Sequence, residues 1–259
     1  MATLKEIQTL RETKGKEQET LSLINEAVSQ AQNDPEMLVT LDWEAALVYQ
    51  HIVMNEVAKP ESNQNQQIIS DAKQKMAEHA NKAHELIVAN DLTDKLPLSH
   101  RFLGRVADYS KNFEEAISHY QKALELFPAD SHSRLELSAF LAYSMVMIGK
   151  VDEGMDLARK TYSDFSNSDL GKSLKEKDYY AWAVWMSGIP PRQLKALQET
   201  GAPYDEEEMR FWLEETKNEL ENPSGKVTWA DNKFQYRIDE LVKSLGALIV
   251  LLILVTARR

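Results

Sequence analysis

The sequence predicts an all-α protein: an α-solenoid of antiparallel helix pairs with a helical C-terminal extension. Apolar residues recur at helical spacing almost everywhere in the chain, and no segment alternates with the period of two that marks a strand. The nine Gly and eight Pro are few for a β protein of 259 residues, which needs many tight turns. A two-helix unit near the middle of the chain is followed by a related unit, as expected when helical hairpins stack on each other.

In the first segment, residues 1–96, helices are expected at about 3–12, 18–32 and 35–57, and a long helix is expected after the linker 59–66, ending near residue 89. Gly15 breaks the first pair. Asp34-Pro35 starts the third helix, because Asp caps free amides and Pro fits the first turn. The linker 59–66, KPESNQNQ, has turn and low-complexity residues and predicts a mobile connection. The helix after it carries an apolar face made of Met76, Ala80, Ala83 and Ile87.

The second segment, residues 97–166, contains the two-helix unit 100–128, HRFLGRVADYSKNFEEAISHYQKALELFP. Gly104 lets a neighbouring helix approach the first helix closely, and Pro128 stops the second helix. Such a hairpin cannot bury its own apolar face, so it must stack on related units. The residues expected to pack the unit are Leu103, Gly104, Ala116, Tyr120, Ala123 and Pro128.

A related unit follows 38 residues later, at about 132–165. The segment NFEEAI (112–117) corresponds to KVDEGM (150–155) at this interval. Gly104 corresponds to Ala142, Phe113 to Val151, Ala116 to Gly154 and Tyr120 to Ala158. Small residues thus fall again where two helices would touch most closely. We therefore expect Ala142, Gly154 and Ala158 to pack the second unit.

The third segment, residues 167–243, predicts a helical extension. SNSDLGKS (166–173) has the composition of a loop. An aromatic-rich helix follows and stops at Gly188 and Pro190-Pro191. Further helices are expected at about 193–198, 205–220 and from 231 onward. Carboxylates gather at the start of the second of these, where they favour the positive end of the helix dipole.

Four aromatic residues lie close together on the helix before Gly188: Tyr179, Tyr180, Trp182 and Trp185. Aromatic side chains with a polar tip are favoured interface anchors, so this cluster is a candidate partner-binding site. Large aromatics also dominate protein cores, and core packing of the same helix stays open as the alternative. Both hold if Trp182 packs inward while Tyr180 faces a groove.

Residues 100–128 resemble the tetratricopeptide repeat. The family pattern of a Leu-Gly pair, two Ala flanking an aromatic residue and a closing Pro is matched at Leu103, Gly104, Ala116, Tyr120, Ala123 and Pro128. His100 stands where Trp is usual, and Ala107 stands where Tyr is usual. The unit at 132–165 keeps the small positions but lacks the closing Pro. Residues 1–91 fit as degenerate helix pairs, and 167–259 do not visibly match.

The resemblance implies a right-handed superhelix that holds a peptide or helix of a partner protein in its groove. One subgroup of the family binds the acidic C-termini of heat-shock chaperones through an Asn, Lys and Arg clamp. Leu103 and Phe140 stand where that Asn would be expected, so this specificity does not carry over to the chain.

The last segment, residues 244–259, is an apolar tail whose fourteen residues 244–257 carry no charge. A helix of that length spans about 21 Å, whereas a hydrocarbon core is about 30 Å thick. A short span still anchors if the bilayer thins and the flanking basic residues reach its surfaces. A helix that is apolar all round needs apolar surroundings on every side. Two readings therefore stay open: a membrane anchor, or burial within this chain or a partner.

Composition and the lack of catalytic motifs argue against several classes of function. The net charge of −11 disfavours nucleic-acid backbones, which need a basic footprint. The chain has no Cys, so disulfides, thiolate metal sites and a cysteine nucleophile are excluded. His79 and His84 are five residues apart, which does not place them on one helix face as a zinc pair requires. No glycine-rich phosphate loop or serine elbow is present, so we expect no catalytic site, cofactor or metal.

The sequence therefore favours a non-enzymatic interaction scaffold that binds a protein partner. We expect a cytoplasmic location, because the N-terminus lacks the apolar core of a secretory signal. If 244–257 contacts a membrane, the larger number of basic residues before it keeps the body of the protein on the cytoplasmic face. The alternative function is a constitutive subunit of a larger complex, with the tail buried against another subunit.

Overall fold

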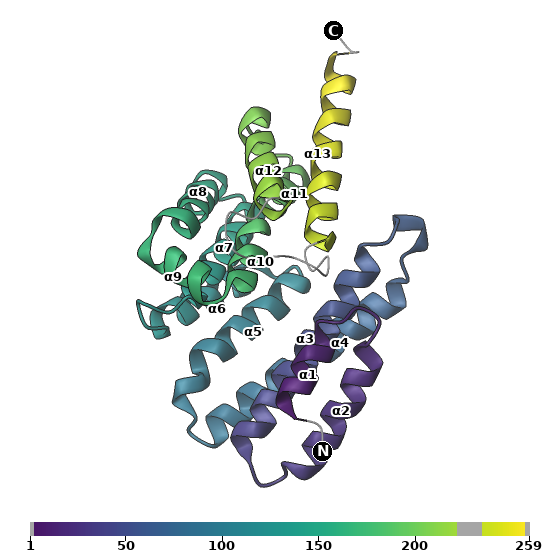
Figure 1. Ribbon diagram of the computed structural model, residues 1–259, viewed down its shortest axis with the longest axis vertical. Helices are drawn as coiled ribbons and strands as arrows, with labels where there is room; N and C mark the ends of the chain where they lie inside the picture. Colours follow the sequence, from purple (N-terminus) through teal and green to yellow (C-terminus); the bar gives the residue numbers. More distant parts are fainter. Residues whose placement is uncertain (1–2, 222–234, 257–259) are drawn as a thin grey trace. The chain divides into compact units, whose positions relative to one another are not determined.

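The computed structural model describes residues 3–221 and 235–256, with side chains described up to Leu248 in the last helix. Helices connected by turns make up all of this described part, and no strand occurs in it (Figure 1). The all-α class expected from the sequence is confirmed. The chain divides into two compact units, Met1–Leu126 and Phe127–Arg259, and the boundary falls inside the segment 97–166.

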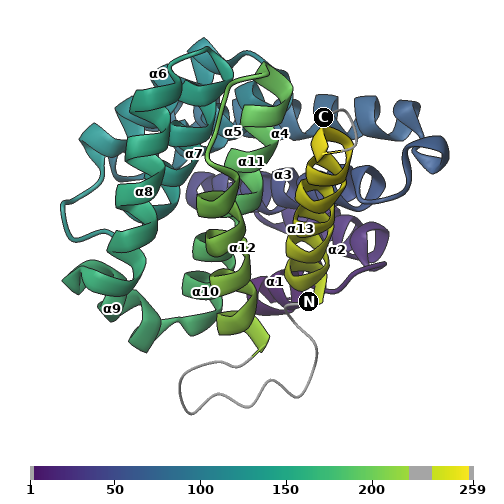
Figure 2. The same ribbon diagram turned by 90° about the horizontal axis from the view of Figure 1, so that it is seen from above.

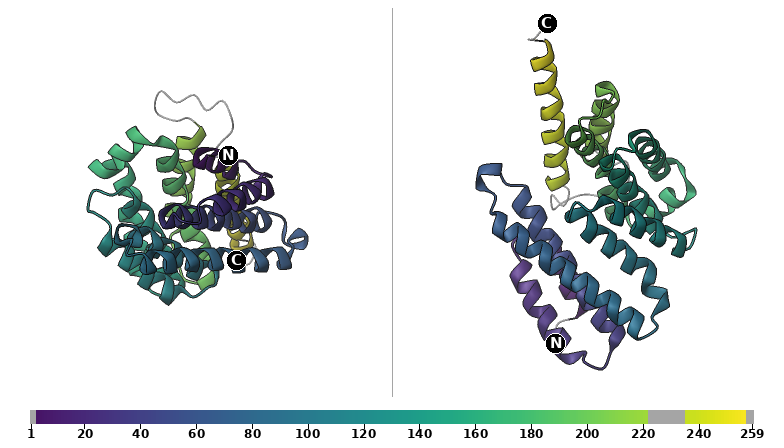
Figure 3. Two further views of the ribbon diagram at one scale, coloured as in Figure 1. Left: turned by 90° about the horizontal axis from the view of Figure 1, so that it is seen from below. Right: turned by 180° about the vertical axis from the view of Figure 1, so that it is seen from behind.

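Unit 1 consists of three successive helix pairs. Their helices are α1 (Leu4–Arg11), α2 (Glu17–Gln30), α3 (Pro35–Val57), α4 (Gln66–Ala89), α5 (Leu96–Tyr109) and α6 (Phe113–Leu126). The long helices α3 and α4 lie side by side and antiparallel, and α5 packs on α4 (Figures 1 and 3). Stacking of one hairpin on the next is therefore present within this unit, as the sequence predicts.

Local sequence explains where these helices begin. Asp34 Oδ1 accepts a hydrogen bond from the backbone N–H of Met37 at 3.0 Å, so α3 starts at Pro35 as expected. Thr3 and Glu6 form a capping box at the start of α1. The predicted apolar face of α4 is at most 1% exposed at Met76, Ala80, Ala83 and Ile87.

The linker 59–66 differs from the expected mobile connection. It contains a short 3-10 helix, Glu61–Asn63, and two side chains hold its ends. The Gln64 amide donates to the carbonyls of Val57 and Lys59, both at 3.0 Å, and the backbone N–H of Asn65 donates to Glu56 Oε1 at 2.7 Å. Polar residues that resemble a flexible linker in sequence here satisfy the end of α3 and the start of α4.

Unit 2 contains the remaining helices: α7 (Ser133–Met147), α8 (Val151–Asn167), α9 (Asp169–Lys177), α10 (Tyr179–Ser187), α11 (Ile189–Thr200), α12 (Glu206–Glu221) and α13 (Gln235–Thr256). The α7–α8 hairpin packs against α11, and α13 lies beside α12 (Figures 1 and 2). One continuous core joins these helices and includes Trp182, Leu197, Trp212 and Leu241.

The prediction of a loop at 166–173 is wrong. Helix α8 continues to Asn167, and α9 begins at Asp169 after a single residue. Ser168 Oγ accepts the backbone N–H of Gly171 at 3.0 Å and so caps α9. A Cβ at Gly171 would lie 2.7 Å from the carbonyl carbon of Phe165, so only glycine lets the first turn of α9 lie against the last turn of α8. Ser and Gly mark a helix junction here.

The helix expected at 193–198 is longer than predicted. Helix α11 starts at Ile189 and includes Pro190 and Pro191 in its first turn. A proline there loses only an N–H that has no partner within the helix, so the pair begins this helix as well as ending α10.

Helix α13 contains the described part of the apolar tail. Leu241 and Leu248 are fully buried in the unit 2 core, whereas Val242 on the outer side is 49% exposed. The end of α13 extends past α12 (Figures 1 and 3). No helix within the described ranges is both long and apolar enough to cross a bilayer. The expected helix start at 231 lies outside the described residues.

Candidate partner-binding surfaces

The α5–α6 hairpin is closed by contact between Gly104 and Tyr120. The ring of Tyr120 is fully buried and lies directly over Gly104, where a Cβ would be 2.6 Å from Tyr120 Cδ1. Ala116 and Ala123, one turn before and after Tyr120, are also fully buried. Leu103 is 9% exposed. A small residue facing a large one thus sets the short distance between the two helices.

A buried polar group fixes the same hairpin. Tyr120 donates its hydroxyl hydrogen to Asp108 Oδ2, and Arg105 Nη1 lies 2.9 Å from that oxygen. Burial, together with the Asp108 charge, raises the pKa of Tyr120 well above its ordinary value. Arg105 and Asp108 are not among the residues predicted from the sequence. Their spacing of three on one helix, opposite a tyrosine, is the signal that could have found them.

The α7–α8 hairpin repeats this arrangement with different residues. A Cβ at Gly154 would lie 2.7 Å from Val146 Cγ2 and 2.8 Å from the Ala142 carbonyl oxygen. Ala142 and Ala158 are fully buried. In both hairpins a glycine lies where the two helices approach most closely. It is Gly104 on the first helix of α5–α6 and Gly154 on the second helix of α7–α8. Pro128 is exposed and follows the end of α6 at Leu126.

The four aromatic residues of α10 do not form one exposed patch. Trp182 is 1% exposed, and its Nε1–H donates to the Phe165 carbonyl at 2.8 Å. Tyr179, Tyr180 and Trp185 are partly buried and pack against the same core. Trp182 is therefore a core residue, and the other three each keep part of their surface accessible.

Lys175 of α9 covers one side of this cluster. Its Nζ lies 4.1 Å from the centre of the Trp182 ring and 3.0 Å from Glu219 Oε1 on α12. The Tyr179 hydroxyl donates to the same Glu219 oxygen at 3.2 Å. Burial and the Glu219 charge raise the pKa of Tyr179. The cation, the rings and the carboxylate join α9, α10 and α12.

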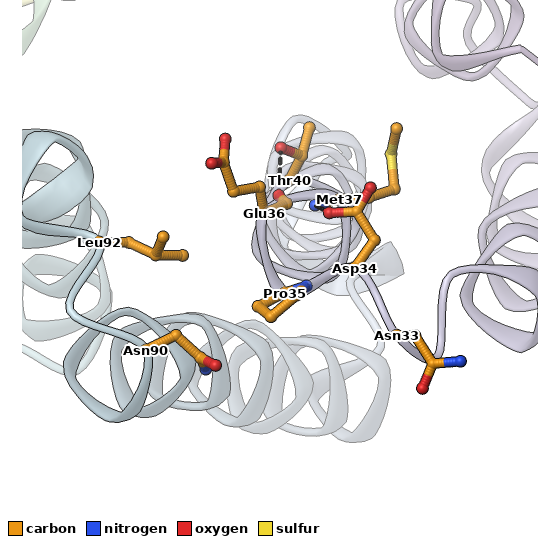
Figure 4. A pocket seen from close by; sticks show the side chains of 8 residues that line it. All are labelled: Asn33, Asp34, Pro35, Glu36, Met37, Thr40, Asn90 and Leu92. Carbon is orange, nitrogen blue, oxygen red and sulfur yellow. Dashed lines mark hydrogen bonds between the residues drawn. The ribbon is translucent and has the colours of Figure 1, made fainter.

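Unit 1 has a hollow of about 710 Å³ at the start of α3 (Figure 4). Its lining residues are Asn33, Asp34, Pro35, Glu36, Met37, Thr40, Asn90 and Leu92. Asp34 already accepts the Met37 amide, and Glu36 pairs with Lys95 at 3.1 Å. Because carboxylates lie at its rim and the helix amide is taken, the hollow does not suit an anion.

The two histidines of α4 have separate partners. His79 Nδ1 lies 2.8 Å from Asp42 Oδ1, and His84 Nδ1 lies 2.9 Å from Ser99 Oγ. Both are packing contacts between neighbouring helices. Across the part of the chain that the structure describes, no group of three or more His, Asp or Glu side chains is arranged to hold a metal ion.

Comparison with known proteins agrees with the hairpin geometry. Residues 97–130 match the family model described as tetratricopeptide repeat. No curated protein matches the chain. The match covers α5, α6 and the turn after them, which are the residues whose Gly104–Tyr120 contact sets the hairpin. The chain therefore contains a tetratricopeptide repeat at residues 97–130.

Proposed function

We propose that the protein is a non-enzymatic scaffold that holds a peptide or helix of a partner protein against its stacked hairpins. The observation that carries this proposal is the tetratricopeptide repeat at 97–130, because such repeats generally bind proteins. The polar groups inside the hairpin support it. Asp108 and Arg105 are engaged with Tyr120 and each other and so serve the packing of the hairpin.

The contact residues that we propose in unit 2 are Tyr180 and Trp185. Both are partly exposed on α10, and both are held by a helix whose inner residue, Trp182, is anchored in the core. Preordered aromatic side chains lose little entropy on binding, which is why they are frequent anchors at interfaces. Tyr179 and Trp182 keep the cluster in position, because their polar atoms bond to Glu219 and Phe165.

Affinity capture with the full-length chain tests this function. We expect one or more proteins to be enriched on the wild type and lost on Trp185→Ala and Tyr180→Ala. Phe211→Ala is the matched control, since Phe211 is an aromatic residue of unit 2 that is 62% exposed on α12. Partners that bind equally to all three variants would contradict the role of α10. Failure to enrich any protein would contradict the scaffold function.

The second candidate function, a constitutive subunit of a larger complex, is favoured by the uncharged run 244–257. Leu248 of this run is buried in the unit 2 core. A run that is apolar all round also needs apolar surroundings on its other faces, which either another subunit or a membrane on whose cytoplasmic face the protein sits would provide. Fractionation of cells that express the full chain or a chain ending at Lys243 separates these cases. Carbonate-resistant pelleting of the full chain alone indicates a membrane, and co-purification of the full chain alone with a fixed partner indicates a subunit. Circular dichroism of both forms shows whether the truncated chain stays folded.

A further inference from the structure

Three histidines from three successive helices of unit 1 meet at one place. His84 lies on α4, His100 on α5 and His119 on α6. Nδ1 of His100 and Nδ1 of His119 are 3.1 Å apart. The ring centres of His84 and His100 are 5.7 Å apart, and those of His100 and His119 are 5.3 Å apart. The cluster therefore bridges the matched repeat to the helix before it.

The contact between the two Nδ1 atoms depends on protonation. It is a hydrogen bond only when one ring donates an N–H and the other ring accepts it. If only one of the two rings takes up a proton, the other ring stays neutral and its unprotonated Nδ1 can still accept the hydrogen bond. When His100 and His119 are both doubly protonated, two N–H groups face each other and two positive charges lie 5.3 Å apart. Such a pair repels.

The surroundings do little to offset that charge. Lys122 on α6 adds a further positive charge that acts on His100 and His119. The carboxylate that faces the cluster is Glu115, and it is 3.8 Å from His119 Nε2 with its side chain 56% exposed. Ser99 on α5 offers His84 a hydroxyl and no charge. Burial, followed by the other two histidines and Lys122, lowers the pKa of His100 to about 4. Burial also lowers the pKa of His119, against the pull of Glu115.

We propose that His84, His100 and His119, here called the histidine latch, form a pH-sensitive contact that holds α4, α5 and α6 together at neutral pH and loosens their packing in acid. The latch is a property of the repeat stack and does not depend on which partner the scaffold binds. Acid weakens the contact of α5 with α6, where His100 meets His119, and the contact of α5 with α4, where His100 meets His84. A repeat surface keeps its shape only while these helices stay packed.

The direction follows from proton linkage. A histidine whose pKa is lowered in the closed form binds protons more tightly once the contact opens. The closed form is therefore fully favoured above the ordinary histidine pKa of 6.5, and this advantage is lost as pH falls toward 4. For His100 alone, the opening constant should rise about tenfold between pH 7.5 and 5.5.

Hydrogen–deuterium exchange of the full chain measures this opening. Samples at pH 7.5 and 5.5 contain EDTA, so that metal binding to imidazole does not contribute, and rates are corrected for the intrinsic effect of pH. We expect opening of α4, α5 and α6 peptides to rise about tenfold at pH 5.5 in the wild type. His100→Phe should lose most of that rise. His132→Gln should keep it, because His132 contacts Ser173 in unit 2.

Two results would overturn the latch: no acid-induced opening in the wild type, or the full rise retained in His100→Phe. If His100→Phe does not fold, nuclear magnetic resonance titration of the wild-type imidazoles decides the matter. Titration of His100 and His119 with ordinary pKa values near 6.5 would then refute the proposal.

Discussion

Substitution of Gly104 tests the packing of the matched repeat. Alanine at an interior helix position is normally more stable than glycine by about 1 kcal/mol. Here the added Cβ would lie 2.6 Å from Tyr120 Cδ1, roughly 1 Å inside an ordinary contact. The ring cannot move away freely, since Tyr120 is fully buried and its hydroxyl is bonded to Asp108. Overpacking of this kind costs about 1–3 kcal/mol.

We therefore expect Gly104→Ala to lower the free energy of unfolding by about 1–2 kcal/mol, and Gly104→Leu by about 3 kcal/mol. Gly246→Ala is the control, because among the described residues no atom outside its own stretch of α13 lies within 4 Å of its Cβ position. It should be neutral or stabilising by up to about 1 kcal/mol. Urea unfolding followed by circular dichroism at two wavelengths measures each variant.

A double substitution separates the clash from other effects. In a Tyr120→Leu background the ring is absent, so adding Gly104→Ala should cost much less than it does in the wild type. Gly104→Ala that is as stable as the wild type, or more stable, would refute the close contact. Equal costs in both backgrounds would show that Tyr120 is not the cause.

Three further predictions concern other buried contacts. Gly171→Ala should lower the free energy of unfolding by about 2 kcal/mol and with it the melting temperature, since the added Cβ would meet the rigid backbone of Asp164 and Phe165. An unchanged melting temperature would contradict the close contact between α8 and α9 at Gly171. Tyr120→Phe should cost about 1–2 kcal/mol in urea unfolding, because buried Asp108 loses its hydroxyl partner; a neutral result would mean that water replaces the hydroxyl. The wild type should lose about 2.5 kcal/mol of stability between pH 6.5 and 4 through His100, whose pKa is lowered to about 4. His100→Phe should flatten that part of the pH profile of unfolding, and parallel profiles would exclude the latch.

Features of the fold that depend on neighbouring residues in the chain could be predicted from the sequence. The caps and turn formers around Asp34 and Gly15 place the first helices within a few residues of their observed bounds. The 38-residue interval located two hairpins and the small residues inside them, because close packing of two helices requires a small side chain at the same place in each unit. Local composition was misleading at 166–173, where Ser168 and Gly171 join two helices without a loop.

The candidate binding residues likewise could be located from the sequence, but their orientation could not. The aromatic cluster could be found from its spacing on one helix, and the sequence left open which ring packs inward. Trp182 is the buried one, because the Phe165 carbonyl and the rest of the core lie on its side of α10.

From its sequence alone the protein is determined to be helical, built of repeated hairpins and related to the tetratricopeptide repeat, because periodicity, caps and small residues act over a few turns of one chain segment. Only the tertiary structure decided that Asp108 bonds Tyr120 and that His84, His100 and His119 meet. These contacts depend on how three separate helices are rotated and offset against each other, and residue spacing along the chain does not specify that geometry.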